Sequence, residues 1–248
     1  MIILNEEVVA REYVENPTMN NNSPIDTLTL VARYYLGEGY SNKIVHQLLG
    51  TYILRCDSLA SIPRWDNAIE SAIRRASKRP LLKIDSIPIS KTELEKVTST
   101  GSRLASRLAF TLLCLSKYWN IVRDSNTYWV NTPDREIMRL ANINTSIKYE
   151  SDIYRKLKEL GLIEYSRKID VTHVRVTFAD EETPVLQIED FRNLGFQYQR
   201  YMGEPYKECA LCGELFPVPK RQKGMPRKYC KSCAVIPTQT RYKLMKSR

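Results

Sequence analysis

The chain has 248 residues, of which 43% are hydrophobic and 27% are charged, a composition that argues against general disorder. The net charge of +10 favours an anionic partner. No apolar run approaches the roughly 20 residues that a membrane helix needs, and the start of the chain lacks the basic n-region of a signal peptide. We therefore expect a cytoplasmic protein, without a membrane segment, whose six cysteines are metal ligands or buried thiols.

Opposite charges gather at the two ends of the chain. The segment from Arg200 to the end holds twelve basic and three acidic residues, which gives it a net charge of +9. The first 26 residues carry a net charge of −4. This asymmetry indicates separate roles for the two ends. A basic tail that only increases solubility is the alternative.

The first part of the chain predicts an arm and a helical domain. Residues 1–23 are acidic and end in a polar stretch typical of a linker, so they predict an N-terminal arm that could bind a partner. Residues 24–101 follow as a helical domain, because apolar residues recur at helical spacing from three starting positions, Pro24, Ser41 and Arg64. A small β-hairpin across Asp85-Ser86 and a helix with a capping box of Ser90 and Glu93 complete this predicted domain.

Residues 102–180 predict a helix, a short strand, two helices separated by a turn, and two final strands. The last of these helices carries Ile153, Leu157 and Leu160 on its inner face and ends at Gly161. The order of elements, together with the segment Ile153-x3-Leu157-x2-Leu160-Gly161-Leu162-Ile163, resembles winged helix-turn-helix regulators. In that family the leucines anchor a recognition helix to the core, and the glycine turns the chain into the wing.

The resemblance implies a DNA-binding surface on this domain. If the recognition helix buries its apolar face, it would present three residues to a major groove, Lys148, Ser151 and Arg155. The wing would place three further cations near phosphates, Arg167, Lys168 and Arg175.

Two alternatives weigh against this assignment. The domain could bind only protein, because Glu150 and Asp152 lie where their charge would repel phosphate. Arg155 could also form no more than an ion pair with Asp152 or Glu159, three and four residues away on the same helix.

Four cysteines near the end of the chain form two matched pairs, Cys209-Ala-Leu-Cys212 and Cys230-Lys-Ser-Cys233, with seventeen residues between them. This spacing is typical of a structural zinc site, because zinc prefers four tetrahedral ligands and each Cys-x-x-Cys turn supplies two thiolates. We predict one structural Zn²⁺ bound by all four cysteines. Four thiolates fill the coordination shell, so catalytic zinc is not expected. One alternative is that the two pairs are adventitious, and another is a redox dithiol, which two matched pairs fit less well.

The segment from Cys209 to Phe216, with Gly213 after the second cysteine, resembles the small zinc-ribbon or treble-clef knuckles of bacterial and phage proteins. Between the two cysteine pairs lies a run of basic residues that predicts a phosphate-contacting loop, namely Lys220, Arg221, Lys223, Arg227 and Lys228. The two remaining cysteines, Cys56 and Cys114, lie in apolar helical settings and are predicted to be inert core thiols.

These features predict a mainly α fold with small β elements (α+β). A helical N-terminal domain is followed by a winged helix-turn-helix, by a connector over residues 181–203, and by a zinc-knuckle domain with a basic tail over residues 204–248. No P-loop, dinucleotide-binding turn or catalytic triad is present, so we expect neither an enzyme nor a small-molecule substrate, with a nuclease-type site scattered in the sequence as the alternative.

The predicted function is binding of DNA, double-stranded rather than single-stranded, in the transcription regulation or replication initiation of a phage or mobile element. A non-enzymatic adaptor or inhibitor is the alternative, and it would bind a host protein complex through the acidic arm and the helical domain.

Overall fold

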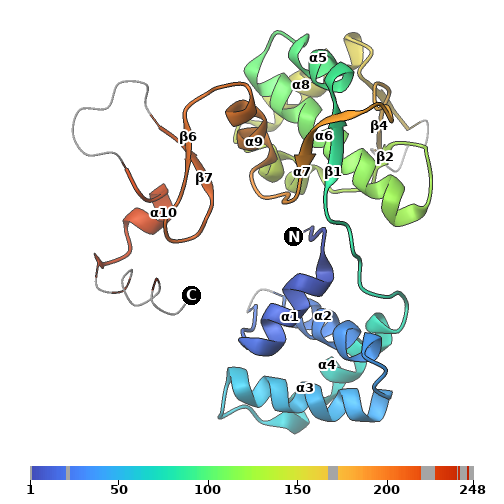
Figure 1. The fold of residues 1–248 in the computed structure, drawn as a ribbon, viewed down its shortest axis with the longest axis vertical. Helices are drawn as coiled ribbons and strands as arrows, with labels where there is room; N and C mark the ends of the chain where they lie inside the picture. The colour runs from blue at the N-terminus through green and yellow to red at the C-terminus, as the bar shows by residue number, and fades with distance from the viewer. Residues whose placement is uncertain are drawn as a thin grey trace. The chain divides into compact units, whose positions relative to one another are not determined.

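The computed structural model describes residues 2–20, 23–166, 173–218, 227–238, 240 and 245. Within these ranges the chain forms ten helices and seven short strands, which confirms the predicted fold class of mainly α with small β elements. The chain divides into two compact units, Met1–Asp85 and Ser86–Arg248, which we call unit 1 and unit 2 (Figure 1). The predicted winged-helix, connector and zinc segments therefore all fall in unit 2.

Unit 1 consists of four helices, α1 (Glu6–Glu15), α2 (Pro24–Gly37), α3 (Asn42–Cys56) and α4 (Ile62–Ala76). Proline at the first position of α2 suits a helix start, because its missing N–H would have no intrahelical partner there. The core of the unit gathers the apolar faces that the sequence predicts, with Leu28, Val31, Leu49 and Ile69 fully buried. Burial of these faces is what holds short helices together, since isolated helices of this length are marginal in water.

The predicted acidic arm is instead a packed part of unit 1. The Glu6 carboxylate at the start of α1 is only 10% exposed and lies 3.0 Å from Nη1 of Arg33 and 2.7 Å from Nη2 of Arg79. The same carboxylate accepts a hydrogen bond from the Leu82 N–H at 2.9 Å, and the Ile84 N–H donates to a carbonyl at the start of the chain. Glu6 thus attaches α1 both to α2 and to the segment that follows α4.

Unit 2 is built around helix α6 (Arg103–Arg123), in which 15 of the 21 residues are buried. A helix that is buried nearly all round needs partners on every side. These partners are α5 (Lys91–Thr98), α7 (Asp134–Leu140), α8 (Ile147–Glu159) and α9 (Leu194–Tyr201). The capping box predicted for α5 is confirmed, because Ser90 and Glu93 exchange both hydrogen bonds.

Unit 2 also contains a three-stranded antiparallel sheet, whose strands lie in the sequence on both sides of α7 and α8. It contains β2 (Trp129–Val130), β3 (Ile163–Tyr165) and β4 (Val174–Val176) in the order β2-β4-β3. All six elements that the sequence predicts between residues 102 and 180 are present in the predicted order. The prediction for α8 is wrong in one detail. Leu160 follows the last helical residue and is 45% exposed, while Tyr154 is buried beside Ile153 and Leu157.

The predicted β-hairpin across Asp85-Ser86 is wrong. The isoleucines there do form a strand, β1 (Ile87–Ser90), but its partner is β5 (Pro184–Ile188), antiparallel, with Ile87 opposite Ile188. Alternation of apolar residues identifies a strand from its own sequence, whereas the partner strand lies about a hundred residues away and leaves no local signal.

The predicted connector is also an integral part of unit 2. Helix α9 lies so close to the end of α7 that a Cβ on Gly195 would overlap the carbonyl oxygen of Ala141. Arg107 of α6 donates through Nε to that same oxygen at 2.9 Å, and its guanidinium lies 4.9 Å from the ring centroid of Phe196. The side-chain oxygen of Asn142 accepts from the Phe196 N–H at 3.2 Å, so the turn after α7 caps α9. The backbone and side-chain contacts of α9 therefore make it part of the fold.

Candidate metal centre

The C-terminal module of unit 2 places both cysteine pairs on short turns. It consists of the hairpin of β6 (Tyr206–Glu208) and β7 (Leu215–Pro217), followed by α10 (Lys231–Ala234). The first pair lies in the hairpin turn, where Gly213 has a φ of +74°, in the left-handed region that favours glycine. Cys230 of the second pair is the N-cap of α10, and its sulfur accepts from the Cys233 N–H at 3.5 Å.

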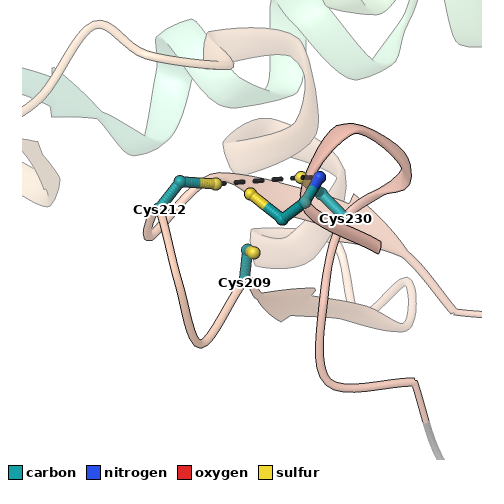
Figure 2. Close-up of side chains that lie close together, drawn as sticks. Cys209, Cys212 and Cys230 are labelled. Atoms are coloured by element: carbon teal, nitrogen blue, oxygen red, sulfur yellow. Dashed lines mark hydrogen bonds between the residues drawn. The ribbon is translucent and has the colours of Figure 1, made fainter. Parts of the chain in front are cut away.

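The four sulfur atoms of Cys209, Cys212, Cys230 and Cys233 all lie within 4.8 Å of one another. The Sγ atoms of Cys212 and Cys230 are 3.8 Å apart, and the labelled side chains in Figure 2 converge on one small region. A Zn–S distance of about 2.3 Å in a tetrahedron gives sulfur–sulfur distances of about 3.8 Å. The cluster can therefore hold a metal ion, as the sequence predicts, and the donor set and its spacing fit a tetrahedral one.

The thiols of Cys209, Cys212 and Cys233 differ in pKa, because their surroundings differ. Burial raises the pKa of Cys209, but hydrogen bonds from the backbone N–H groups of Cys230, Cys212 and Leu211 lower it to about 6. Burial raises the pKa of Cys212 and of Cys233 above the ordinary value of a thiol. A metal ion that binds all four sulfurs must displace the protons of the less acidic thiols, so its affinity falls as pH falls.

The apolar interior of this module is small. Among its described residues, the apolar cluster around the cysteines has Leu211 and Phe216 as buried members, with Val218, Tyr229 and Ile236 packed partly against them. An interior of this size offers little hydrophobic stabilisation. A structural metal can supply on the order of 10 kcal/mol to such a module, which accounts for four ligands in so short a segment.

The basic loop between the cysteine pairs is described only at its end. Arg227 stacks over the ring of Phe216 at 5.5 Å, and Lys228 is exposed while its carbonyl accepts from the Ala210 N–H at 2.9 Å. The other three predicted phosphate contacts, Lys220, Arg221 and Lys223, lie outside the described residues.

The predicted contact residues of α8 are all exposed, but one of them has partners within the helix. Lys148 and Ser151 lie in the first two turns on the solvent side. Arg155 forms an ion pair with Asp152 at 2.6 Å and lies 3.9 Å from Glu159, which is the alternative that the sequence left open. An exposed pair of this kind contributes little to stability. The Arg155 guanidinium would nevertheless have to leave these carboxylates before it could bind a base.

On the predicted wing, Arg175 of β4 is exposed and lies 3.4 Å from a carboxylate oxygen of Glu164 on β3. The other two wing residues, Arg167 and Lys168, lie outside the described residues. In the described part of the wing, the charge of Arg175 is therefore already partly neutralised by Glu164 on the neighbouring strand.

Sequence reasoning missed the exposed apolar residues at the start of α8. Ile147 is 81% exposed and Tyr149 is 50% exposed. Ile147 borders a groove of about 670 Å³ between α7 and α8, whose lining also includes Arg135 and Arg139. The spacing gave no such signal, because Ile147 lies seven residues before the buried Tyr154 and therefore shares its helical face.

Comparison with protein-family models, with curated proteins and with solved structures gives no match to this chain. Among the helices of the described ranges, none has the length and apolar character needed to cross a membrane.

Proposed function

We propose that this chain binds duplex DNA through helix α8, in the transcription regulation or replication initiation of a phage or mobile element, and that one structural Zn²⁺ holds its C-terminal module together. One observation carries the proposal. Helix α8 buries Ile153 and Leu157 in unit 2, follows α7 after a short turn, and leaves its opposite side exposed, with Lys148, Ser151 and Arg155 on it. A helix presented in this way, with the antiparallel strands β3 and β4 after it, suits entry into a major groove.

The contact set at the start of α8 differs from the one that sequence spacing favours. Lys148 and Ser151 remain as groove-facing polar residues. Ile147 adds an apolar side chain that suits contact with a thymine methyl group. Arg155 would have to leave Asp152 before it could bind guanine, so we assign it a smaller role in base recognition.

The donor set favours zinc over other metals. Four thiolates in tetrahedral spacing suit zinc, whereas calcium and magnesium prefer oxygen ligands. When bound, the metal would be structural, because cysteine sulfur atoms would occupy all four positions. With the metal bound, the segment of residues 200–248, which has a net charge of +9, would belong to a folded module and could neutralise phosphates.

A salt titration of duplex binding tests the proposal. The observed affinity for a random duplex, followed by fluorescence anisotropy, should fall linearly with the logarithm of salt concentration, because each phosphate contact releases counterions. Lys148→Ala should weaken binding, whereas the matched control Lys96→Ala, which removes an exposed cation from α5, should not. A salt dependence near zero would contradict DNA binding and favour the adaptor that binds a host protein.

A further inference from the structure

Helix α4 in unit 1 presents an uninterrupted polar row to solvent. The helix buries Ile69, Ala72, Ile73 and Ala76 in the core of the unit. On its opposite side, residues that follow one another at spacings of three and four form a row without a carboxylate, which the turn after the helix continues at Lys78, and we call it the α4 row: Arg64, Asn67, Ser71, Arg74 and Lys78. Such spacing places side chains along one face of a helix.

The cations of the α4 row differ from their neighbours in having no acidic partner. In the described part of the chain, no ion pair joins Arg64, Arg74 or Lys78 to a carboxylate. By contrast, Arg75 lies 3.5 Å from Asp26, and Arg79 and Lys83 lie 2.7 and 2.6 Å from glutamates of α1.

This separation of charge occurs within a unit that is neutral as a whole. Residues 1–85 contain ten basic and ten acidic residues. Glu6 and Glu7 of α1 bind cations of their own unit, and Asp66, on the flank of α4, lies 2.9 Å from His46. These three carboxylates are thereby engaged by other side chains of unit 1, and none of the ion pairs among the described residues reaches a cation of the α4 row.

A groove beside the α4 row extends the cationic surface onto α3. The groove has a volume of about 740 Å³, and its lining includes Lys43 and Gln47 of α3 together with Arg74. Glu70 also lines it, one helical turn before Arg74, so one carboxylate borders the row at this point. Lys43 is exposed and adds a fourth cation to this side of unit 1.

We propose that the α4 row binds the sugar–phosphate backbone of duplex DNA, as a second contact surface in addition to α8; this inference rests on the proposed function. From Arg64 to Arg74 the helical part of the row extends about 15 Å, at 1.5 Å per residue, and Lys78 follows in the turn beyond the helix. Duplex DNA carries one negative charge for about every 1.7 Å of its axis, so several phosphates fall within this span.

The chemistry of the row suits phosphate rather than bases. Arginine and lysine neutralise phosphate oxygens, and the amide of Asn67 and the hydroxyl of Ser71 can donate to them between the charged contacts. Contacts of this kind position a protein on the duplex without reading its sequence. A second contact on the same chain would also raise the effective concentration of the first, which increases overall affinity without new base contacts.

The test compares two double variants of the full-length chain with equal loss of charge. Arg74→Gln with Lys78→Gln removes two cations of the α4 row. Arg11→Gln with Lys83→Gln removes two cations of unit 1 that already lie beside Glu7. Two lost phosphate contacts should reduce the slope of log affinity against log salt by about 1.8 on random duplex DNA. The control pair should leave this slope close to that of the wild type.

A charge-preserving variant guards against a change in folding. Arg74→Lys with Lys78→Arg should retain the wild-type slope, and circular dichroism should give the same melting curve for all variants. If the wild-type chain shows no salt-dependent duplex binding, the proposed function fails and the inference fails with it. If the wild type binds duplex DNA and the Arg74 and Lys78 double variant keeps the full slope, only the inference is overturned. If the Arg74 and Lys78 double variant loses binding to vesicles containing phosphatidylserine while its duplex binding is unchanged, the inference is overturned in favour of binding to a membrane surface.

Discussion

The ammonium group of Lys117 on α6 lies 2.7 Å from a carboxylate oxygen of Glu93, and both side chains are buried, at 10% and 0% exposure. The ammonium also donates to the Pro88 carbonyl at 2.9 Å. The Glu93 carboxylate in turn accepts from the backbone N–H groups of Ser90 and Asp180. One ion pair thus connects the central helix of unit 2 to β1, to the start of α5 and to the segment before β5.

Replacing this lysine should destabilise unit 2 strongly. Lys117→Met leaves the Glu93 carboxylate buried without its cation, and breaking a buried pair in this way costs about 3–5 kcal/mol. Urea unfolding followed by the fluorescence of Trp119 and Trp129, in a Trp65→Phe background, reports on unit 2 alone.

The matched control for that substitution is Lys91→Met. Lys91 is 78% exposed and lies 3.9 Å from Glu95, so its loss should change the free energy of unfolding by no more than about 0.5 kcal/mol. Equal effects of the two substitutions would show that the buried pair has no special role.

Glu6→Gln should lower the stability of unit 1. The substitution removes the charge that holds Arg33, whose side chain is only 14% exposed, and leaves buried donors poorly satisfied at a cost of about 1–3 kcal/mol. Trp65 fluorescence during urea unfolding, in a background with Trp119→Phe and Trp129→Phe, measures the change. Glu7→Gln is the adjacent control and should have a much smaller effect, because its partner Lys83 is 64% exposed. A chain whose first residues form only a loose arm would respond to neither substitution.

Gly195→Ala should destabilise unit 2 by about 1–3 kcal/mol, because the added methyl group has no space beside the Ala141 carbonyl and the Arg107 side chain. Gly50→Ala is the control in a helix interior. A Cβ at position 50 meets only an atom of Ile62, at an ordinary 3.8 Å, so alanine should be neutral or stabilising there. Thermal unfolding of both variants measures the difference. An unchanged melting temperature for Gly195→Ala would mean that α9 does not pack on the end of α7.

Cys212→Ser should remove metal from the C-terminal module. The purified wild-type chain should contain about one zinc ion per molecule, and the variant much less, because structural zinc requires its full ligand set. Elemental analysis gives the metal content, and limited proteolysis should show new cleavage only beyond about residue 200. Cys56→Ser should keep the metal, since Cys56 lies in unit 1. Equal metal content in wild type and Cys212→Ser would contradict a four-cysteine site.

The ion pair of Glu136 and Arg139 on α7 should make a small, pH-dependent contribution to stability. Hydrogen bonds from the Arg139 guanidinium lower the pKa of Glu136 below its ordinary value of 4.5. A lowered pKa stabilises the folded state above pH 4.5, and this contribution disappears as pH falls through the lowered value. Glu136→Gln should therefore be less stable than wild type at pH 7, by under about 1 kcal/mol, and the difference should shrink as the pH falls below 4.5. A difference that stays constant with pH would exclude this explanation.

Local signals allowed much of the structure to be predicted. The Ser90 and Glu93 capping box lies within four residues, and each cysteine pair lies within a single turn, so the physics that produces these features acts between near neighbours. The same holds for Pro24, which fixes the start of α2.

The contacts that sequence reasoning missed join residues far apart in the chain. Glu6 meets Arg79 across 73 residues, and the amide of Asn142 meets the backbone of Phe196 across 54. An acidic residue near the start of a chain has the same appearance whether it remains solvated or becomes buried, because only the tertiary fold supplies its partners. The prediction that Leu160 lies on the buried face of α8 was wrong for a related reason. The apolar spacing continues past Glu159, the residue at which the helix ends.

The pairing of β1 with β5 sets an order for folding during synthesis. All elements of unit 1 are complete by Asp85, so this unit can fold while the rest of the chain is still being made. Strand β1 emerges immediately afterwards, yet Ile87 must wait for Ile188 before its backbone is paired. At about 5–20 residues per second, that wait lasts roughly 5–20 s. During this interval β1 is an unpaired, isoleucine-containing strand, which makes unit 2 the part of a growing chain most exposed to aggregation and to capture by chaperones.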